Sequence, residues 1–468
     1  RDWSSDVCSS DLLRDLTALL DGPLAGLFGG VHLLPFFPPI DGADAGFDPI
    51  DHTRVDPRLG DWSDVHALGE RVHVMADLIV NHMSAESPQF QDFLARGDAS
   101  RWAGLFLTRD SVFPGGASAA ELARIYRPRP GAPFTDVRLA NGEMRALWTT
   151  FTSNQIDIDV NHPTGREYLL SILDRFASAG VRAIRLDAAG YAIKKRGTSC
   201  FMLPETFAFI REIAERAHER GIEALVEIHS HYATQIGIAS HVDSVYDFAL
   251  PPLLLHALCF RTGEALERWI RVRPQNCYTV LDTHDGIGIV DIGADGGKPG
   301  LVPAAELDRL IEHIHERSGG QSRQATGASA SNLDLYQVNC TYLDACGRDA
   351  EAYLAARAIQ LFLPGIPQIY YVGLLGGTND MDLLARTRVG RDINRHYYTR
   401  EEIERALATP MVRRLCELIR LRNAHPAFGG TFEVLPGPAH ELRLRWSAGS
   451  ERAELAVDFR GPSFTVSA

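Results

Sequence analysis

The chain has 468 residues, of which 45% are hydrophobic and 23% are charged, the composition of an ordinary globular protein. Its net charge at pH 7 is −13 and it contains no basic block, so nucleic acid and membrane surfaces are unsuitable partners. The longest apolar runs, such as LPPLLLHAL at 250–258, are too short to cross a membrane as a helix. Seven cysteines without a CxxC motif predict reduced thiols in a cytoplasmic protein, with Cys340 and Cys346 as two buried thiols.

The first twelve residues, RDWSSDVCSSDL, share no pattern with the rest of the chain. They have no initiator Met, no signal-peptide pattern and no apolar periodicity. We therefore expect residues 1–12 to be a non-native segment in the place where a first barrel strand should precede LRDLTALL.

From residue 13 onward, apolar strand-like runs alternate with helical stretches, which predicts a parallel α/β sheet. A closed barrel of this type needs eight strands, and the chain offers seven, so we expect a (β/α)₈ TIM barrel whose first strand is missing. The helix expected over PETFAFIREIAERAHERG ends at Gly221, a good C-terminal cap. The seven expected strands are 30–37, 74–81, 182–188, 223–229, 244–250, 278–284 and 367–373.

Two long stretches interrupt this alternation, and the pattern changes again near the C-terminus. Residues 83–160, after the third barrel strand, lack barrel periodicity and predict a small inserted domain. Residues 286–340, after the seventh strand, are rich in Gly, Ala and Ser and predict long rim loops with short helices. Residues 427–468 alternate apolar and polar side chains, which predicts an antiparallel β-domain that is cut short. The barrel itself would then consist of residues 13–82, 161–285 and 341–426.

Three acids each follow a short apolar run: Asp187 in AIRLDAAG, Glu227 in ALVEIHS and Asp285 in YTVLDTHDG. Such acids lie at the C-terminal ends of parallel strands, where barrels of this type build their active sites. Glycoside chemistry needs a nucleophile or base and a proton donor, and a third ionised acid can stabilise positive charge on the sugar. The alternative is three unrelated acids that happen to end three strands. A second polar group beside each acid argues against it, namely Arg185, His229 and His284.

Seven longer motifs carry a resemblance to a known family. They are DGADAGFDPIDH (41–52), DLIVNHMS (77–84), RLDAAGY (185–191), EIHSHY (227–232), LDTHDGIG (281–288), SNLDLYQVN (331–339) and GRDINRHYY (390–398). This set resembles that of the α-amylase superfamily, and more closely its sucrose phosphorylase branch. GTSCFM, LDLYQVN and GRDINRHYY are the motifs that point to phosphorolysis. The resemblance runs from about residue 13 to the end and departs from the family at the N-terminus and in the short C-terminal domain.

The resemblance implies a role for each of the three acids. Asp187 would attack the anomeric carbon and form a covalent β-glucosyl ester. Glu227 would protonate the leaving fructose and then act as base, while Asp285 would stabilise the oxocarbenium-like transition state. This order retains configuration, so the carboxyl groups of Asp187 and Glu227 should lie about 5 Å apart. Arg185 would hold Asp187 ionised, although a plain salt bridge predicts much the same geometry.

The resemblance also implies a subsite for the glucosyl ring and one for the acceptor. His82 and His284 would bind neighbouring hydroxyls, and Asp44 and Arg391 would form an ion pair beneath the sugar. The glucosyl subsite would use Asp44, Phe47, His82, Gln155, His284, Asp285 and Arg391, with Phe151 stacking on the ring. The acceptor subsite would use Arg129, Tyr191, His229 and the backbone of Leu335 and Tyr336 for phosphate, and Asp334 and Gln337 for fructose.

Arg129 lies in YRPRPG, and Arg suits phosphate because its planar fork donates two parallel hydrogen bonds. Without the resemblance, an exposed Pro-stiffened loop with solvated arginines would be the better interpretation of this motif. The pattern His229-Ser-His231 is similar to a metal-binding HxH, but no further Asp or His cluster supports it. No Walker loop or GxGxxG follows a strand, so we expect neither a metal nor an organic cofactor.

The resemblance thus implies sucrose, inorganic phosphate, glucose 1-phosphate and fructose as small-molecule partners, and it suggests a homodimer. Three alternatives stay open at this point. One is a sibling phosphorylase that acts on sucrose 6′-phosphate, glucosylglycerate or glucosylglycerol. Another is a hydrolase or transglucosidase, in which water or a second sugar takes the glucosyl group. The last is a non-catalytic amylase-like scaffold.

Overall fold

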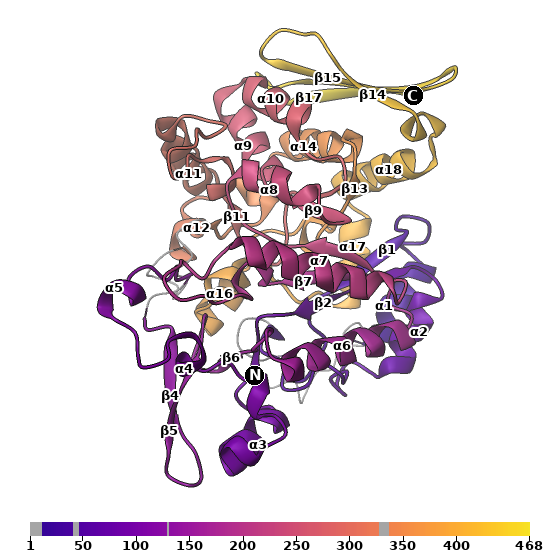
Figure 1. The fold of residues 1–468 in the computed structure, drawn as a ribbon. Coiled ribbons are helices and arrows are strands. Elements are labelled where there is room, and N and C mark those ends of the chain that lie inside the picture. Colours follow the sequence, from indigo (N-terminus) through magenta and orange to yellow (C-terminus); the bar gives the residue numbers. More distant parts are fainter. Residues whose placement is uncertain (1–11, 41–45, 129–130, 327–336) are drawn as a thin grey trace. The chain divides into compact units, whose positions relative to one another are not determined.

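The computed structural model describes residues 12–40, 46–128, 131–326 and 337–468 (Figure 1). Two compact units make up the chain. The first comprises Arg1–Ile228 with His241–Asp243, and the second comprises His229–Ser240 with Ser244–Ala468. The expected non-native segment 1–12 and the barrel strand that it would replace lie, except for Leu12, outside the described residues.

The first unit is built on four parallel strands in the order β1, β2, β7 and β8. They are β1 (Gly30–Leu33), β2 (His73–Ile79), β7 (Ala183–Asp187) and β8 (Glu223–Val226). All residues of β2 after His73 are buried, as in a parallel sheet that is covered on both faces. The four strands that the sequence predicts in this region are therefore confirmed, although each is shorter than expected.

Four helices accompany these strands: α1 (Leu13–Asp21), α2 (Trp62–Gly69), α6 (Pro163–Ser178) and α7 (Pro204–His218). α6 and α7 begin with Pro at a first-turn position, where the missing N–H has no helical partner to lose. Gly221, with φ +70°, ends the turn after α7 in the left-handed region, as its predicted capping role requires.

The segment between β2 and α6 forms smaller elements of its own. β3 (His82–Ser84) pairs antiparallel with β6 (Gln155–Asp157), and β4 (Phe134–Arg138) with β5 (Met144–Trp148). Figure 1 shows the β4–β5 hairpin projecting from the rest of this unit. The expected domain limits, 83 and 160, remain a prediction. The short helices here and just after β7 are α3 (Pro88–Arg96), η2 (Gly97–Ala99), η3 (Ala103–Leu105), α4 (Arg109–Val112), α5 (Ala119–Leu122) and η4 (Ala189–Tyr191).

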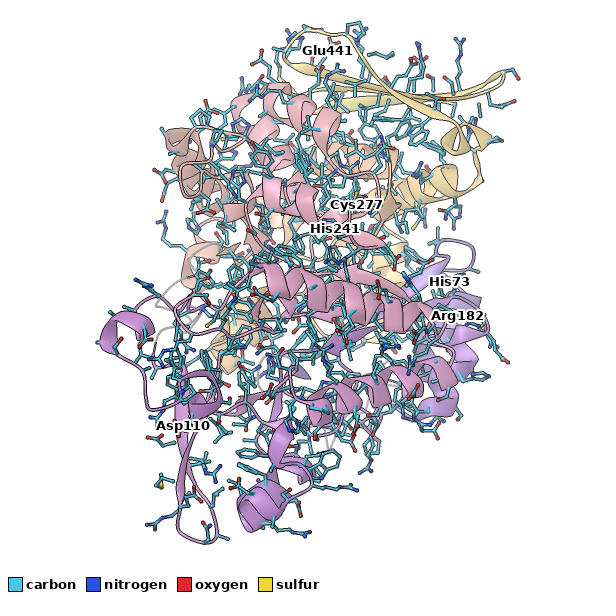
Figure 2. The ribbon with its side chains drawn as sticks, in the orientation of Figure 1. His73, Asp110, Arg182, His241, Cys277 and Glu441 are labelled. Atoms are coloured by element: carbon cyan, nitrogen blue, oxygen red, sulfur yellow. The ribbon has the colours of Figure 1, made fainter. Side chains whose placement is uncertain are left out.

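The second unit contains three parallel strands, β9 (Ser244–Asp247), β10 (Cys277–Thr279) and β13 (Ile366–Pro367). Cys277, labelled in Figure 2, is buried, and burial raises the pKa of its thiol to about 12. The strand predicted over 367–373 is wrong beyond Pro367, because Tyr371–Leu374 forms helix α15. The helices around these strands are α8 (Tyr232–Ala239), α9 (Leu250–Phe260), α10 (Glu264–Val272), α14 (Ala350–Phe362) and α18 (Pro410–Ala424).

The expected rim segment 286–340 contains a short antiparallel pair, β11 (Ile287–Gly288) with β12 (Gln337–Val338). Its helix α11 (Ala304–Arg317) spans 14 residues, so it is longer than the short helices that the sequence suggested. The remaining small elements of this unit are η5 (Val290–Ile292), α12 (Gln321–Gln324), α13 (Tyr342–Ala345), α16 (Met381–Thr387), η7 (Gly390–Asn394), α17 (Arg400–Leu407) and η8 (Pro426–Gly429).

The C-terminal antiparallel sheet is confirmed, with strand order β14-β15-β16-β17 (yellow in Figure 1). In β15, Leu442, Leu444 and Trp446 alternate with less buried residues, as in a sheet with one covered face. The Trp446 indole Nε1 donates a 2.6 Å hydrogen bond to the carbonyl of Phe362 in α14 and so attaches the sheet to that helix. The strands are β14 (Thr431–Leu435), β15 (Glu441–Ala448), β16 (Glu451–Asp458) and β17 (Ser463–Ser467).

Two further expectations concern the thiols and the membrane. Cys340 and Cys346 are both buried and free, as predicted, and burial raises the pKa of the Cys346 thiol to about 12. Within the described ranges, no helix combines the length and the apolar character that a membrane crossing requires.

Candidate active site

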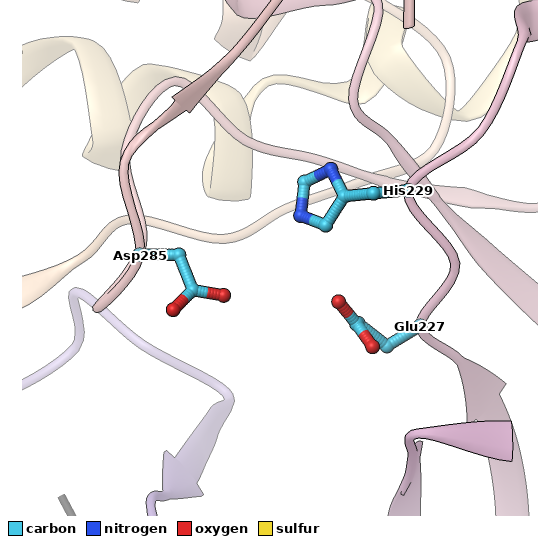
Figure 3. A group of neighbouring side chains, drawn as sticks. All are labelled: Glu227, His229 and Asp285. Atoms are coloured by element: carbon cyan, nitrogen blue, oxygen red, sulfur yellow. The ribbon is translucent and has the colours of Figure 1, made fainter. Parts of the chain in front are cut away.

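Asp187 and Glu227 lie at the C-terminal ends of neighbouring strands in the first unit. Asp187 is the last residue of β7 and pairs with Ile79, the last residue of β2. Glu227, labelled in Figure 3, directly follows β8, and its N–H donates to the Leu186 carbonyl at 3.3 Å. The parallel register therefore brings both acids to one edge of the strands, as the apolar runs before them predicted.

A single guanidinium contacts both acids. Arg185 Nη1 donates to Asp187 Oδ1 at 2.9 Å, and its Nη2 lies 3.7 Å from Glu227 Oε1. The side chain of Arg185 is 4% exposed, so water screens these charges little. Arg185 thus favours the ionised form of Asp187, the residue that the motif RLD predicted as its partner.

Asp77 holds Arg185 in its orientation. This contact was not predicted from the sequence. Asp77 Oδ1 accepts from Arg185 Nη1 at 2.7 Å, and its Oδ2 lies 3.1 Å from His32 Nε2. Burial alone would raise the pKa of Asp77, but the charges of His32 and Arg185 outweigh it and lower this pKa to about 2. The sequence did contain a sign of this contact, namely a carboxylate inside the apolar run VMADLIV. A fully buried charge needs a partner, so such a carboxylate predicts a buried cation nearby.

Three of the residues expected to bind the glucosyl ring, Phe47, Phe151 and Gln155, gather around His82 in the first unit. His82 Nε2 donates to the Phe47 carbonyl at 2.8 Å, and Gln155 Nε2 donates to the same oxygen at 3.2 Å. The Phe151 ring meets the His82 ring edge-on with centroids 5.1 Å apart. Tyr191, which the sequence analysis placed in the phosphate subsite, packs its ring 5.1 Å from that of Phe151. The structure therefore brings these side chains together, with aromatic faces beside polar groups.

Asp285 lies among cations in the second unit. Its Oδ1 is 2.8 Å from Arg391 Nη1, 3.6 Å from His284 Nε2 and 3.9 Å from Arg395 Nη2. Burial opposes ionisation, but Arg391, His284 and Arg395 together hold the pKa of Asp285 far below its usual range. Asp285 is thus a fixed negative charge. Arg391 forms an ion pair with Asp285, whereas its predicted partner, Asp44, lies outside the described residues.

His229, labelled in Figure 3, is held in one orientation by Phe248 and Asp291 of the second unit. Its ring stacks on Phe248 with centroids 3.9 Å apart, and its Nδ1 donates to Asp291 Oδ2 at 3.2 Å. Gln337 Nε2 donates to His229 Nε2 at 3.4 Å, so two predicted acceptor-subsite residues do contact each other. A pocket of this unit is lined in part by His229 and Asp285. Asp291 was not foreseen, because only the fold brings it to His229.

A buried ion pair lies beside the Asp285 loop. Asp282 Oδ2 accepts from Arg357 Nη2 at 2.5 Å, and Arg357 Nε donates to the Tyr353 hydroxyl at 2.9 Å. Burial alone would lower the pKa of Arg357, but Asp282 and Tyr353 outweigh it and raise this pKa. The backbone of Gly373 covers the pair so closely that a Cβ there would lie 1.9 Å from Asp282 Oδ2. This packing explains why residues 371–374 do not continue β13.

The remaining residues expected in the acceptor subsite cannot be placed. Arg129, Asp334, Leu335 and Tyr336 lie, like Asp44, outside the described residues.

Comparison with known proteins shows what this chain is similar to. Residues 27–256 match the model of the α-amylase catalytic domain. A sucrose phosphorylase of Agrobacterium vitis is 62% identical over 464 residues, which cover 99% of this chain and 95% of that protein. The chain belongs to the sucrose phosphorylase family. A second member, a sucrose phosphorylase of Bifidobacterium adolescentis, is 52% identical and covers 97% of this chain and 90% of its own length.

A solved structure of this family supports the same conclusion for the fold. The crystal structure of a sucrose 6F-phosphate phosphorylase from Thermoanaerobacter thermosaccharolyticum is 38% identical, with a TM-score of 0.90. It covers 97% of this chain and 92% of that one. The family and the fold class that the motifs predicted are therefore confirmed: a (β/α)₈ barrel of the α-amylase type with a C-terminal antiparallel sheet.

Proposed function

We propose that this protein is a retaining phosphorylase that converts sucrose and inorganic phosphate into α-D-glucose 1-phosphate and D-fructose. The observation that carries the proposal is the contact of one buried guanidinium, that of Arg185, with both Asp187 and Glu227. A retaining mechanism needs a nucleophile and an acid that are only about 5 Å apart, and a shared cation supports such a spacing. The two sucrose phosphorylases at 62% and 52% identity support the choice of sucrose.

In the first half-reaction, Asp187 attacks the anomeric carbon of the glucosyl group while Glu227 gives a proton to the departing fructose oxygen. The bond from the anomeric carbon to fructose breaks as the ester to Asp187 forms. Arg185 keeps the nucleophile ionised until attack, because its 2.9 Å bond is stronger to a carboxylate than to an acid. Asp285, held ionised by Arg391, stabilises positive charge on the sugar in the transition state.

In the second half-reaction, phosphate attacks the anomeric carbon, Glu227 takes the phosphate proton and Asp187 is released. The fixed orientation of His229 between Phe248 and Asp291 supports its assignment to the phosphate subsite, together with Tyr191 and Arg129. The glucosyl ring is bound by the His82 cluster with His284 and Arg391, and fructose by Asp334 and Gln337.

The activity test measures phosphate-dependent release of glucose 1-phosphate from four donors: sucrose, sucrose 6′-phosphate, glucosylglycerol and glucosylglycerate. We expect sucrose to be the best donor. A clear preference for another donor would identify a sibling phosphorylase. Sucrose 6′-phosphate is included because the sucrose 6F-phosphate phosphorylase is 38% identical to this chain. Release of free glucose without phosphate would indicate a hydrolase, and no turnover of any donor would indicate a scaffold.

The nucleophile is tested by Asp187→Asn, which removes the attacking oxygen's charge but little volume. We expect it to retain less than about a thousandth of the rate, because the covalent step supplies several kcal/mol of barrier lowering. Asp174→Asn is the matched control, since Asp174 is 65% exposed and pairs with Arg220 at the surface. Near-normal activity of Asp187→Asn would refute the assignment.

We further propose that the protein works as a cytoplasmic homodimer. The six described cysteines are free, and five of them are buried, which suits a reducing compartment. Sedimentation equilibrium at micromolar concentration would give about twice the 51.5 kDa chain mass, and the chain mass itself would contradict the dimer.

A further inference from the structure

Lys194 is a buried cation that the proposed mechanism does not use. Its side chain is 2% exposed, and its Nζ lies 2.6 Å from Asp157 Oδ2, a fully buried carboxylate. Nζ also donates to Asn81 Oδ1 at 2.7 Å and to the Tyr191 carbonyl at 2.5 Å. An ammonium has three hydrogens to donate, so all three are used. These three contacts hold the ammonium group of Lys194 in place, and they also hold Asp157, Asn81 and the backbone of Tyr191.

The contact with Asn81 decides which way that amide faces. Nζ can only donate, so the Asn81 atom beside it must be the carbonyl oxygen. The Asn81 Nδ2 group then faces His82, whose Nδ1 lies 3.3 Å away and must accept. In the neutral imidazole the hydrogen is therefore on Nε2, which donates it to the Phe47 carbonyl at 2.8 Å. Lys194 thus determines the tautomer and direction of His82 through one intervening side chain.

The other two contacts reach the aromatic side of the same cluster. Asp157, held by Lys194, accepts from the Thr150 N–H at 2.9 Å and from its hydroxyl at 2.5 Å. Thr150 directly precedes Phe151, whose ring touches those of both His82 and Tyr191. Lys194 therefore connects three chain segments, which carry His82, Phe151 and Tyr191.

We propose that Lys194 is a positioning residue for glucosyl recognition, which sets the hydrogen-bonding direction of His82 and the placement of Phe151. The proposal deepens the proposed function and rests on it for the identity of the sugar. It predicts a defect confined to the glucosyl side of the reaction. Sucrose, glucose 1-phosphate and α-glucosyl fluoride share that group and should all be affected alike.

The kinetic test compares Lys194→Met with Lys195→Met. The two positions are adjacent, but Lys195 is 57% exposed and pairs with Glu205 at the surface, so the second variant is a matched control. We expect Lys194→Met to lower kcat/KM by about 10- to 100-fold, by analogy with the loss seen when a group that orients a metal-binding histidine is removed. The loss should be equal for the three donors, and Lys195→Met should match the wild type. A loss below threefold, or one limited to phosphate and glucose 1-phosphate, would overturn the proposal.

A second test does not depend on activity. In protein labelled with ¹⁵N-histidine, the ring signals lost in His82→Gln identify His82 among the 17 histidines. We expect a neutral Nε2–H tautomer in the wild type. Asn81→Asp retains a partner for Lys194 but presents only acceptors to His82, so Nδ1 should gain a hydrogen. An unchanged His82 spectrum in Asn81→Asp would overturn the proposal, even if Lys194→Met failed to fold. If the wild type lacks phosphorylase activity but His82 shifts as expected, the proposed function fails and the positioning role of Lys194 stands.

Discussion

Asp77→Asn tests how strongly the buried network beneath the nucleophile stabilises the protein. The change keeps the side-chain volume but removes the negative charge that accepts from Arg185 at 2.7 Å and lies 3.1 Å from His32. Removing one partner of a buried ion pair lowers the free energy of unfolding by about 3–5 kcal/mol, because the other charge stays buried. The lowered pKa of Asp77 gives a second value for this loss, because a fall from 3.8 to about 2 corresponds to about 2.5 kcal/mol. We therefore expect a loss of about 3 kcal/mol at pH 7.

The dependence on pH follows from the direction of that shift. A carboxyl whose pKa is lower in the folded state stabilises the fold fully above its unfolded pKa of 3.8, and this contribution is lost as the pH falls toward 2. The stability gap between wild type and Asp77→Asn should therefore narrow between about pH 4 and pH 2.

Urea unfolding followed by circular dichroism measures the gap at pH 7. With a slope near 3 kcal/mol per molar, the midpoint of Asp77→Asn should fall by about 1 M. Asp21→Asn is the control, because Asp21 is 53% exposed and pairs with Arg71 at the surface, where such a loss is within about 1 kcal/mol. If Asp77→Asn unfolds at the midpoint of this control, Asp77 does not anchor Arg185 and the network argument is refuted.

Three further outcomes are expected. Glu227→Gln should lose most activity on sucrose but retain much of it on α-glucosyl fluoride, whose leaving group needs no proton; equal losses in steady-state assays would remove Glu227 as the acid. Iodoacetamide at pH 8 should label the partly exposed Cys259 before the buried Cys277 and Cys346, whose pKa values are both raised to about 12; peptide mass spectrometry would show the order, and simultaneous labelling would contradict it. Trp446→Phe leaves the Phe362 carbonyl without its donor and should lower the free energy of unfolding by about 1–3 kcal/mol, whereas an unchanged denaturation midpoint would show that the contact contributes nothing.

The parts of the site that follow apolar runs were predictable from the sequence. Asp187 and Glu227 end such runs, and parallel strands place those ends at one edge, so local pattern was enough. The partners of these acids were not predictable from pattern, because Asp77 and Arg185 are 108 residues apart in sequence. Lys194 and Asn81, 113 residues apart, show the same limit: hydrophobic periodicity says that a residue is buried but not which charge meets it.

The strand predicted over PQIYYVG is wrong for a different reason. The local preference for a strand was clear, but the structure does not follow it. Aromatic and β-branched residues favour a strand there, but β13 ends at Pro367 and α15 follows. The local pattern contains no information about the buried ion pair of Asp282 with Arg357, against which this turn packs. Propensities of less than 1 kcal/mol per residue are readily overridden by contacts of this kind.

The close cover of that pair by Gly373 has a consequence for how the chain tolerates mutation. A Cβ at this position would meet Asp282 Oδ2 at 1.9 Å and Arg357 Nη2 at 2.0 Å, and neither group has water into which it can move. In a library that carries every amino acid at residue 373, glycine alone should survive selection for folded protein, even though the backbone here needs no left-handed conformation. Gly237, whose Cβ would meet nothing within 4 Å, should accept most small residues. Residue 373 is thus among the positions that tolerate substitution least, although glycine has no side chain. The restriction comes from Arg357 and Asp282, which precede it by 16 and 91 residues in the sequence.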